Sequence, residues 1–116
     1  VKFLNKSFNN IFSKKFDLIV SNPPYIVSKD IKNLSDDIKR YEPRIALDGG
    51  NDGLDLIKKV IYKSKHILKK NGMLAIEIGK GQIKKVSKIL INNNFRVKHV
   101  IKDYKNNVRC VFAHYN

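Results

Sequence analysis

The sequence predicts an α/β fold in which the strands of an open sheet alternate with helices. Two short apolar runs, residues 16–20 and 73–79, are typical of strands buried on both faces of such a sheet. Apolar residues at helical spacing follow each of these runs, which predicts covering helices. The last two apolar segments, residues 95–101 and 108–114, alternate with polar residues, so we expect an antiparallel final strand.

The predicted elements follow the order strand, strand, helix, helix, strand, helix, strand, strand. They cover residues 1–4, 16–20, 28–40, 54–70, 73–79, about 81–92, 95–101 and 108–114. The first helix is expected to end before Pro43, because proline disfavours helical conformation in the residue that precedes it. Asp52 is expected to cap the second helix and Asn71-Gly72 to terminate it. The third helix opens at the turn Gly79-Lys80-Gly81.

The length of 116 residues allows one domain, and no run of about 18 apolar residues predicts a membrane span. The single cysteine, Cys110, excludes an internal disulfide and is typical of a cytoplasmic protein. We expect Cys110 to be a core residue, because the sequence shows no partnered base. His66, His99 and His114 are too dispersed to predict a metal site. The chain begins with Val rather than Met, so we expect a fragment of a longer protein.

The formal net charge of +14 is the one feature of the composition that suggests a nucleic-acid partner. Most of the basic residues are lysines, however, and they are scattered along the predicted solvent faces of the helices with little aromatic interleaving. A gene rich in AT codons encodes many lysines, so the excess of lysine does not require a nucleic-acid ligand. Nucleic acid is therefore a possible partner but not the favoured one.

The tetrapeptide Asn22-Pro23-Pro24-Tyr25 directly follows the apolar run and Ser21. Pro24 pushes Pro23 into an extended conformation, and both prolines have a fixed φ and no N–H. The Asn22 side-chain oxygen and the Pro23 carbonyl are hydrogen-bond acceptors, and Tyr25 adds an aromatic face. This combination suits a flat group that carries an –NH2, and open α/β sheets bind ligands at the C-terminal ends of strands. A simple loop breaker followed by a core tyrosine is the alternative interpretation.

Residues 21–26, Ser-Asn-Pro-Pro-Tyr-Ile, resemble the signature of amino-methyltransferases that use S-adenosylmethionine. Residues 41–47 (Tyr-Glu-Pro-Arg-Ile-Ala-Leu) and 50–54 (Gly-Asn-Asp-Gly-Leu) resemble the segments that follow this signature in one branch of that family. The branch comprises the N5-glutamine methyltransferases that act on peptide-chain release factors. DNA adenine and RNA guanine methyltransferases share the first motif, whereas the combination in this order is more specific.

The resemblance implies that residues 1–116 are a partial methyltransferase catalytic domain. They would form the C-terminal half of a doubly wound, Rossmann-like class I sheet with an antiparallel last strand. The cofactor-binding half of the family would lie upstream of Val1, so we expect residues 16–20 to have an open apolar edge. For the same reason the isolated chain is expected neither to bind S-adenosylmethionine nor to transfer a methyl group. A release factor as acceptor implies a cytoplasmic enzyme.

The resemblance also assigns roles to the residues of the motif. Asn22, Pro23 and Tyr25 would be the catalytic residues, with Asn22 and Pro23 holding the glutamine amide while Pro24 and Tyr25 complete the substrate site. Asn22 and Ser7 would contact the cofactor, S-adenosyl-L-methionine. Lys6 stands where the family has an acidic residue, which puts the cofactor contact there in doubt.

Two questions stay open from the sequence. Glu42 and Arg44 flank Pro43, and they either hold the loop by a local salt bridge or contact the substrate. The rival functions are an amino-methyltransferase that acts on a nucleic-acid base and an inactive, truncated chain.

Overall fold

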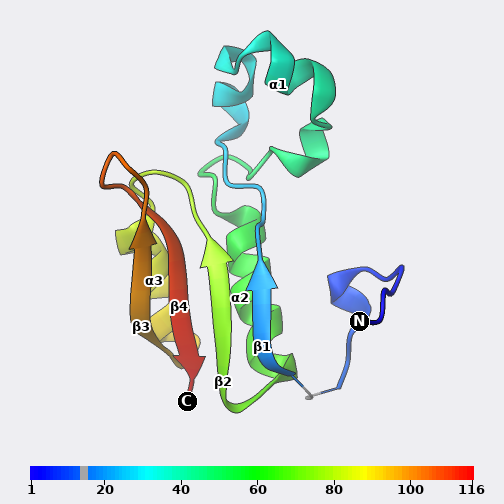
Figure 1. Ribbon diagram of the computed structural model, residues 1–116, viewed down its shortest axis with the longest axis vertical. Helices are drawn as coiled ribbons and strands as arrows, with labels where there is room; N and C mark the ends of the chain where they lie inside the picture. The colour runs from blue at the N-terminus through cyan, green and yellow to red at the C-terminus, as the bar shows by residue number, and fades with distance from the viewer. Residues whose placement is uncertain (14–15) are drawn as a thin grey trace.

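Four strands form one mixed sheet, and two helices cover one of its faces (Figure 1). The computed structural model describes residues 1–13 and 16–116. In the strand order β1-β2-β4-β3, β1 (Phe16–Ser21) and β2 (Leu68–Glu77) are parallel. Strand β4 (Val108–Tyr115) is antiparallel both to β2 and to the edge strand β3 (Phe95–Lys102). The predicted α/β fold with an antiparallel last strand is confirmed, and that strand lies one position in from the edge.

The hydrophobic core lies between the sheet and the helices α2 (Asp55–Ile67) and α3 (Ile83–Asn92). Both helices bury residues spaced four apart, which lie on the same helix face. The sheet contributes alternating residues from its covered face. The buried core residues of these elements include Ile57, Ile61, Val86, Leu90, Leu74, Ile76, Val111 and Ala113.

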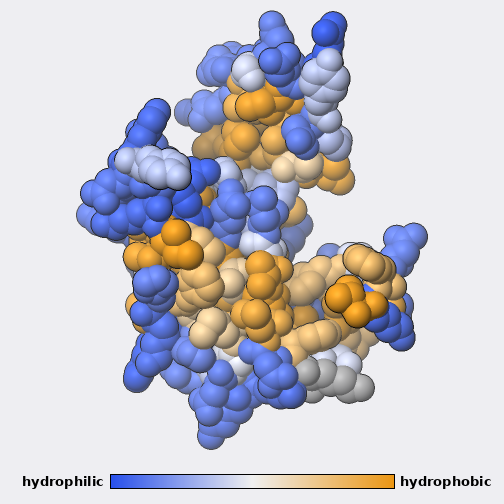
Figure 2. Space-filling model, viewed as in Figure 1, coloured by the Kyte–Doolittle hydropathy of each residue, from blue (hydrophilic) through white to orange (hydrophobic). Residues whose placement is uncertain are grey.

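Strand β1 is an edge strand, so the prediction that residues 16–20 are buried on both faces is wrong. Ile19 is 8% exposed on the side of the helices, whereas Leu18 and Val20 are 52% and 74% exposed on the opposite face. Among the described strands β1 pairs only with β2, which confirms the expected open edge. Figure 2 shows hydrophobic residues across this uncovered side of the sheet. The sequence of β1 is therefore typical of a strand buried on both faces, but the described residues cover only one of its faces.

The predicted strand at residues 1–4 is also wrong. Residues 1–7 have no regular secondary structure, and a short 3-10 helix, η1 (Phe8–Asn10), follows them. A strand is stable only when a neighbour satisfies its main-chain N–H and C=O groups. In the part of the chain that the structure describes, no strand pairs with this segment.

The segment between β1 and α2 lies beyond the C-terminal ends of β1 and β2 (Figure 1). The single helix predicted at 28–40 is instead two pieces, η2 (Ser28–Asn33) and α1 (Asp36–Tyr41). Between them Leu34 and Ser35 are not helical, with ψ of 155° and 150°. Asn and Ser side chains compete for main-chain hydrogen bonds and favour breaks of this kind. Another 3-10 helix, η3 (Arg44–Ala46), completes the segment.

Helix α2 ends three residues earlier than predicted, because β2 begins at Leu68. Asn71-Gly72 does not terminate the helix but lies inside β2, where the pairing shifts between Phe16↔Leu68 and Leu18↔Met73. Asn71 has a φ of 63°, a left-handed conformation that asparagine tolerates. At the other end the N-cap residue is Leu54, and Asp52 accepts the Leu54 N–H at 2.9 Å just ahead of the first turn. No helix among the described residues is long and apolar enough to cross a membrane.

The core predicts unequal effects of truncating two adjacent residues of α3. Leu90 is fully buried, so Leu90→Ala should lower the free energy of unfolding by about 2–5 kcal/mol. Ile91 is 64% exposed, so Ile91→Ala should change it by less than about 0.5 kcal/mol. Urea denaturation of the two variants measures the difference, and equal losses would contradict the packing of α3 on the sheet.

Candidate functional site

The Asn22-Pro23-Pro24-Tyr25 corner forms one wall of a pocket of about 380 Å³ at the C-terminal end of β1. Pro23 is buried, and Asn22 is exposed at the mouth. The opposite wall comes from α1, η3 and their flanking loops, through Ile38, Glu42, Ala46 and Leu47. The structure thus brings together the four motif residues and the loop that the sequence resemblance had singled out.

Main-chain hydrogen bonds hold the corner against the loop that precedes α2. The Ile26 N–H donates to the Leu47 carbonyl at 3.2 Å, and the Gly49 N–H donates to the Ile26 carbonyl at 2.8 Å. The two segments come so close that a Cβ on Gly49 would lie 2.7 Å from the Tyr25 Cα. Only glycine fits at this position, because the atom that such a Cβ would meet belongs to the main chain.

Asp48 holds the same loop through several hydrogen bonds. Its contacts also show whether Glu42 and Arg44 form a salt bridge with each other. Its carboxylate accepts hydrogen bonds from the Ser28 hydroxyl and the Gly50 N–H, and it pairs with Arg44 Nε at 3.2 Å. The Ser28 hydrogen bond, followed by those from Gly50 and Arg44, lowers the pKa of Asp48. Arg44 therefore pairs with Asp48 and not with Glu42. Among the described residues Glu42 has no ion pair, and it lines the pocket.

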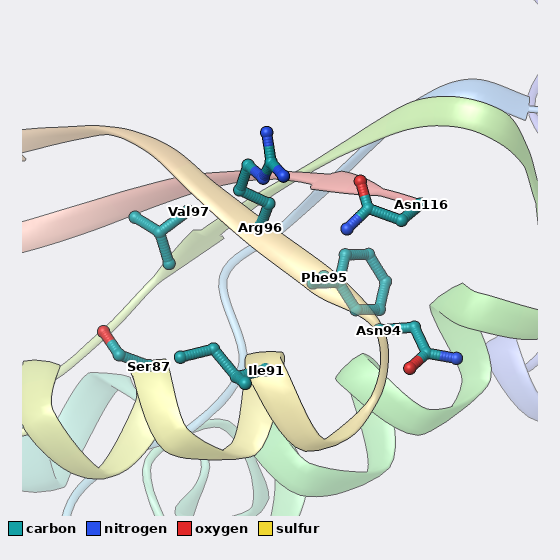
Figure 3. A pocket seen from close by; sticks show the side chains of 7 residues that line it. All are labelled: Ser87, Ile91, Asn94, Phe95, Arg96, Val97 and Asn116. Atoms are coloured by element: carbon teal, nitrogen blue, oxygen red, sulfur yellow. The ribbon is translucent and has the colours of Figure 1, made fainter.

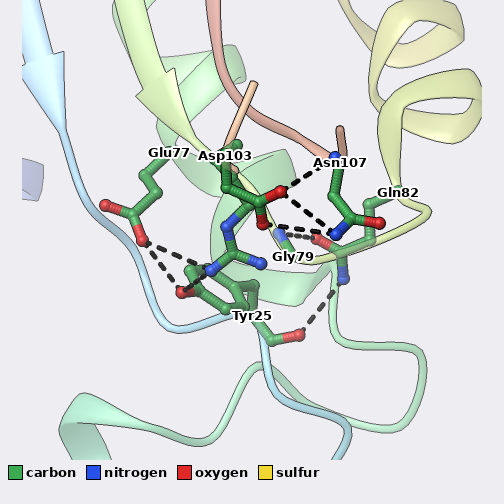
Figure 4. A network of polar contacts seen from close by, with 7 residues as sticks. Tyr25, Glu77, Gly79, Gln82, Asp103 and Asn107 are labelled. Carbon is green, nitrogen blue, oxygen red and sulfur yellow. Dashed lines mark hydrogen bonds and ion pairs between the residues drawn. The ribbon is translucent and has the colours of Figure 1, made fainter. Parts of the chain in front are cut away.

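The Tyr25 hydroxyl is anchored by two charged side chains from the sheet (Figure 4). It donates to Glu77 Oε1 at 2.8 Å and accepts from Arg109 Nη2 at 2.8 Å, while Arg109 and Glu77 lie 3.9 Å apart. The Arg109 guanidinium also lies 5.3 Å from the centre of the Tyr25 ring. Burial and then the hydrogen bond to Glu77 raise the pKa of Tyr25, and Arg109 partly opposes the shift. The ring is therefore held at its polar tip by β2 and β4.

Sequence reasoning missed Glu77 and Arg109, which are 52 and 84 residues away from Tyr25 along the chain. It also missed Gln82, whose side chain contacts the main chain of Tyr25. A signal existed for Glu77 alone: it is the one charged residue in the otherwise apolar run 73–79. Its partner could not have been inferred from the sequence.

Ser7 does not lie with the motif residues. Its hydroxyl accepts the Asn9 N–H at 3.3 Å as the N-cap of η1, and neither Ser7 nor Lys6 lines the pocket beside the corner. Cys110 is half-buried, and burial raises the pKa of its thiol. In the described part of the chain, no group of three or more His, Cys, Asp or Glu residues could hold a metal ion.

A larger hollow of about 680 Å³ lies elsewhere, between α3 and the edge strand β3 (Figure 3). It is lined by Ile91, Phe95 and neighbouring residues, and Arg96 is the single charged side chain among the described residues that line it. These residues carry no convergent set of polar groups of the kind that fixes a ligand. The corner at the end of β1 is therefore the better candidate.

The anchored hydroxyl predicts a specific pH dependence of stability. Because the folded state raises the pKa of Tyr25 above 10.0, it favours the protonated phenol, and this contribution is lost as the pH rises through the folded pKa. Tyr25→Phe should therefore lower the free energy of unfolding at about pH 8, and the deficit should shrink at about pH 11. Urea denaturation of both proteins at the two pH values measures it. A deficit that stays constant would show that the hydroxyl does not titrate in this environment.

The chain is similar to two curated glutamine methyltransferases. It is 47% identical over 100 residues to the release factor glutamine methyltransferase of Clostridium acetobutylicum, a match that covers 86% of this chain. It is 44% identical over 75 residues to the ribosomal protein uL3 glutamine methyltransferase of Francisella tularensis, which covers 65% of the chain. The chain spans 35% and 24% of the lengths of these two relatives. The resemblance seen in the sequence motifs is confirmed by these matches.

The solved structure of a putative DNA modification methylase from Thermus thermophilus matches with a TM-score of 0.60. The match covers 94% of this chain and 49% of that one, and at 16% identity it shows a shared fold alone. The family model for the Eco57I restriction-modification methylases matches residues 1–109. The chain therefore belongs to the methylase family that this model describes.

Proposed function

We propose that this chain forms the acceptor-binding part of an enzyme that methylates the side-chain amide nitrogen of a glutamine in peptide-chain release factors. The methyl donor is S-adenosyl-L-methionine, and the reaction takes place in the cytoplasm, where release factors act. The observation that carries the proposal is a pair of acceptors at the corner that no donor of the described residues occupies. Among the described residues, no donor reaches the Asn22 side chain or the Pro23 carbonyl.

Two free acceptors next to one another suit the two hydrogens of a primary amide. The amide nitrogen is a poor nucleophile, because its lone pair is delocalised into the carbonyl. Acceptors at Asn22 and Pro23 hold the nitrogen in place and favour the positive charge that develops on it. With the donor bound, its methyl group would pass to the amide nitrogen, S-adenosylhomocysteine would leave, and the nitrogen would release one proton to solvent. Correct orientation of the amide nitrogen toward the methyl group supplies most of the rate enhancement. A rigid corner therefore matters more than a general base.

The lining of the pocket fits the chemistry of the donor. S-adenosylmethionine supplies an electrophilic methyl group on a positively charged sulfur. In a chain of net charge +14, Glu42 is the only charged residue among the described residues that line the pocket. Asn22, exposed at the mouth, is the residue of this chain that would contact the methyl-bearing end. Ser7, whose hydroxyl oxygen accepts the Asn9 N–H within η1, would contact the cofactor through the donor hydrogen of that hydroxyl.

Tyr25 would cover the plane of the bound amide with a ring whose direction is set by Glu77 and Arg109. Pro24 lines the same pocket. Arg44 keeps the covering loop in place through Asp48, and Glu42 is available to accept a hydrogen bond from the acceptor protein.

No Lys or Arg of the described residues lines this pocket, which argues against a nucleic-acid acceptor, whose phosphates need basic contacts. A second protein acceptor has a specific observation in its favour. The match to the Francisella tularensis enzyme, at 44% identity, makes a ribosomal protein the alternative to a release factor. Both relatives are named for a glutamine, so the amide is the shared element.

The corner predicts a large loss of activity when its side-chain acceptor is removed. In the full-length gene product that contains this chain, Asn22→Ala should lower kcat by roughly 10²–10³, because one preorganised contact to the amide is lost. The control is Asn92→Ala, which removes an exposed asparagine of α3 and should leave kcat unchanged. Steady-state kinetics with a release factor measures both variants. Near-normal turnover by Asn22→Ala would refute the role of the corner.

The acceptor itself is tested by competition among substrates. Incubation of the full-length gene product with methyl-labelled cofactor should label a release factor at a glutamine and leave DNA and RNA unlabelled. Ribosomal protein uL3 is included as the rival protein acceptor. Label on nucleic acid but not on protein would reverse the assignment, and label on uL3 alone would change the protein substrate while keeping the amide chemistry.

A further inference from the structure

The side chain of Gln82 joins three separate chain segments behind the Asn-Pro-Pro-Tyr corner (Figure 4). Its Nε2 donates to the Tyr25 carbonyl at 3.1 Å and to the Gly53 carbonyl at 3.2 Å. Its Oε1 accepts the Gly79 N–H at 2.8 Å. Tyr25 follows β1, Gly53 precedes α2, and Gly79 follows β2. One amide group therefore bridges the segments that leave two neighbouring strands and the loop that enters a helix.

The space around this amide is too small for other side chains. A Cβ on Gly53 would lie 2.4 Å from the Tyr25 carbonyl oxygen, and the φ of Gly53 is 71°. A Cβ on Gly79 would lie 3.0 Å from the Tyr25 ring and 3.1 Å from the Gln82 amide. Both glycines thus let their main chains approach Gln82 closely enough for direct hydrogen bonds.

The chemistry of the contact requires an amide. Two carbonyl groups need two N–H donors, and one main-chain N–H needs an acceptor, which glutamine supplies from a single planar group. A carboxylate of the same shape could still accept from Gly79, but it would face the two carbonyl oxygens with negative charge. Gln82 is also the N-cap residue of α3, and its side chain makes no capping hydrogen bond there.

We propose that Gln82 is a positioning residue for methyl transfer, an inference that rests on the proposed function. By fixing the Tyr25 carbonyl, it fixes the main chain that follows the two prolines. Because the ring of Pro24 locks its φ, few torsions separate Tyr25 from the Pro23 carbonyl. Gln82 therefore sets the orientation of the Pro23 carbonyl, which accepts a hydrogen bond from the glutamine amide, although Gln82 itself does not contact the substrate.

The test replaces the amide by a carboxylate at two sites of the full-length gene product. Gln82→Glu removes the N–H donors to the Tyr25 and Gly53 carbonyls, whereas a negative charge at the N-terminus of α3 favours the helix. The matched control is Asn93→Asp, in which the half-buried Asn93 amide loses its 2.9 Å hydrogen bond to the Ile89 carbonyl at the other end of α3. The control should be the more harmful to helix stability, because its charge lies at the C-terminus.

Gln82→Glu should lower kcat by about 10–100-fold, because small misplacements of reacting groups cost about this much. The KM for S-adenosylmethionine should change by less than about twofold, and Asn93→Asp should keep the wild-type kcat within about twofold. An unchanged kcat in Gln82→Glu, or an equal loss in Asn93→Asp, would overturn the proposal.

Hydrogen exchange separates this inference from the proposed function. The amides of Ile26 and Gly49, which bond across the corner, should exchange faster in Gln82→Glu and at the wild-type rate in Asn93→Asp. If the wild-type protein methylates no release factor, the proposed function fails, and the exchange rates still decide whether Gln82 holds the corner. If Ile26 and Gly49 exchange at the wild-type rate in Gln82→Glu, the proposal that Gln82 holds the corner is overturned.

Discussion

The close main-chain packing of Tyr25 against Gly49 is the constraint on which the candidate site depends. The corner that precedes Tyr25 contains two prolines, so it can donate few hydrogen bonds to its own surroundings. It is held from outside instead, by the main chain at residues 47–50 and by side chains that reach Tyr25 from the sheet and from α3. These contacts hold the main chain of the corner and leave the Asn22 side chain and the Pro23 carbonyl without a donor from the described residues. Preorganised acceptors of this kind are what a poorly nucleophilic amide requires.

The distribution of charge separates the site from the rest of the surface. The chain has a net charge of +14, but the described residues that line the pocket beside the corner include one carboxylate and no basic side chain. Lys59 of α2 and Lys84 of α3 are exposed on the helices, whereas Lys80 and Lys85 line a separate hollow that also includes Tyr25. The positive charge therefore belongs to the solvated surface of the fold, and it gives little information about what the pocket binds.

Local patterns in the sequence predicted the parts of the structure that depend on local physics. The apolar run before Asn22 became a strand, and the alternating segments near the C-terminus became an antiparallel pair. Errors arose where distant partners decide the outcome. Leu18 and Val20 are apolar but exposed, because no described element covers that face of the sheet. Asn71-Gly72 is a good helix terminator, but the pairing of Leu68 with Phe16 starts β2 earlier.

The candidate site likewise contains residues that the sequence identifies and contacts that depend on distant parts of the chain. Asn22 to Tyr25 could be found from the sequence, because the chemistry of an acceptor-only corner lies in four consecutive residues. The contacts of Glu77 and Gln82 with Tyr25 could not be found, because each joins residues more than 50 positions apart along the chain. From the sequence, Glu42 and Arg44 could each form a local salt bridge or contact the substrate. The position of Asp48 shows that Arg44 is the paired residue, whereas Glu42 lines the pocket.

The most direct measurement is a crystal structure of the full-length gene product with S-adenosylhomocysteine and a release-factor peptide that contains the target glutamine. The glutamine amide nitrogen should lie within about 3 Å of both the Asn22 side-chain oxygen and the Pro23 carbonyl oxygen. A glutamine bound elsewhere, with the two acceptors satisfied by groups of the protein itself, would contradict this expectation.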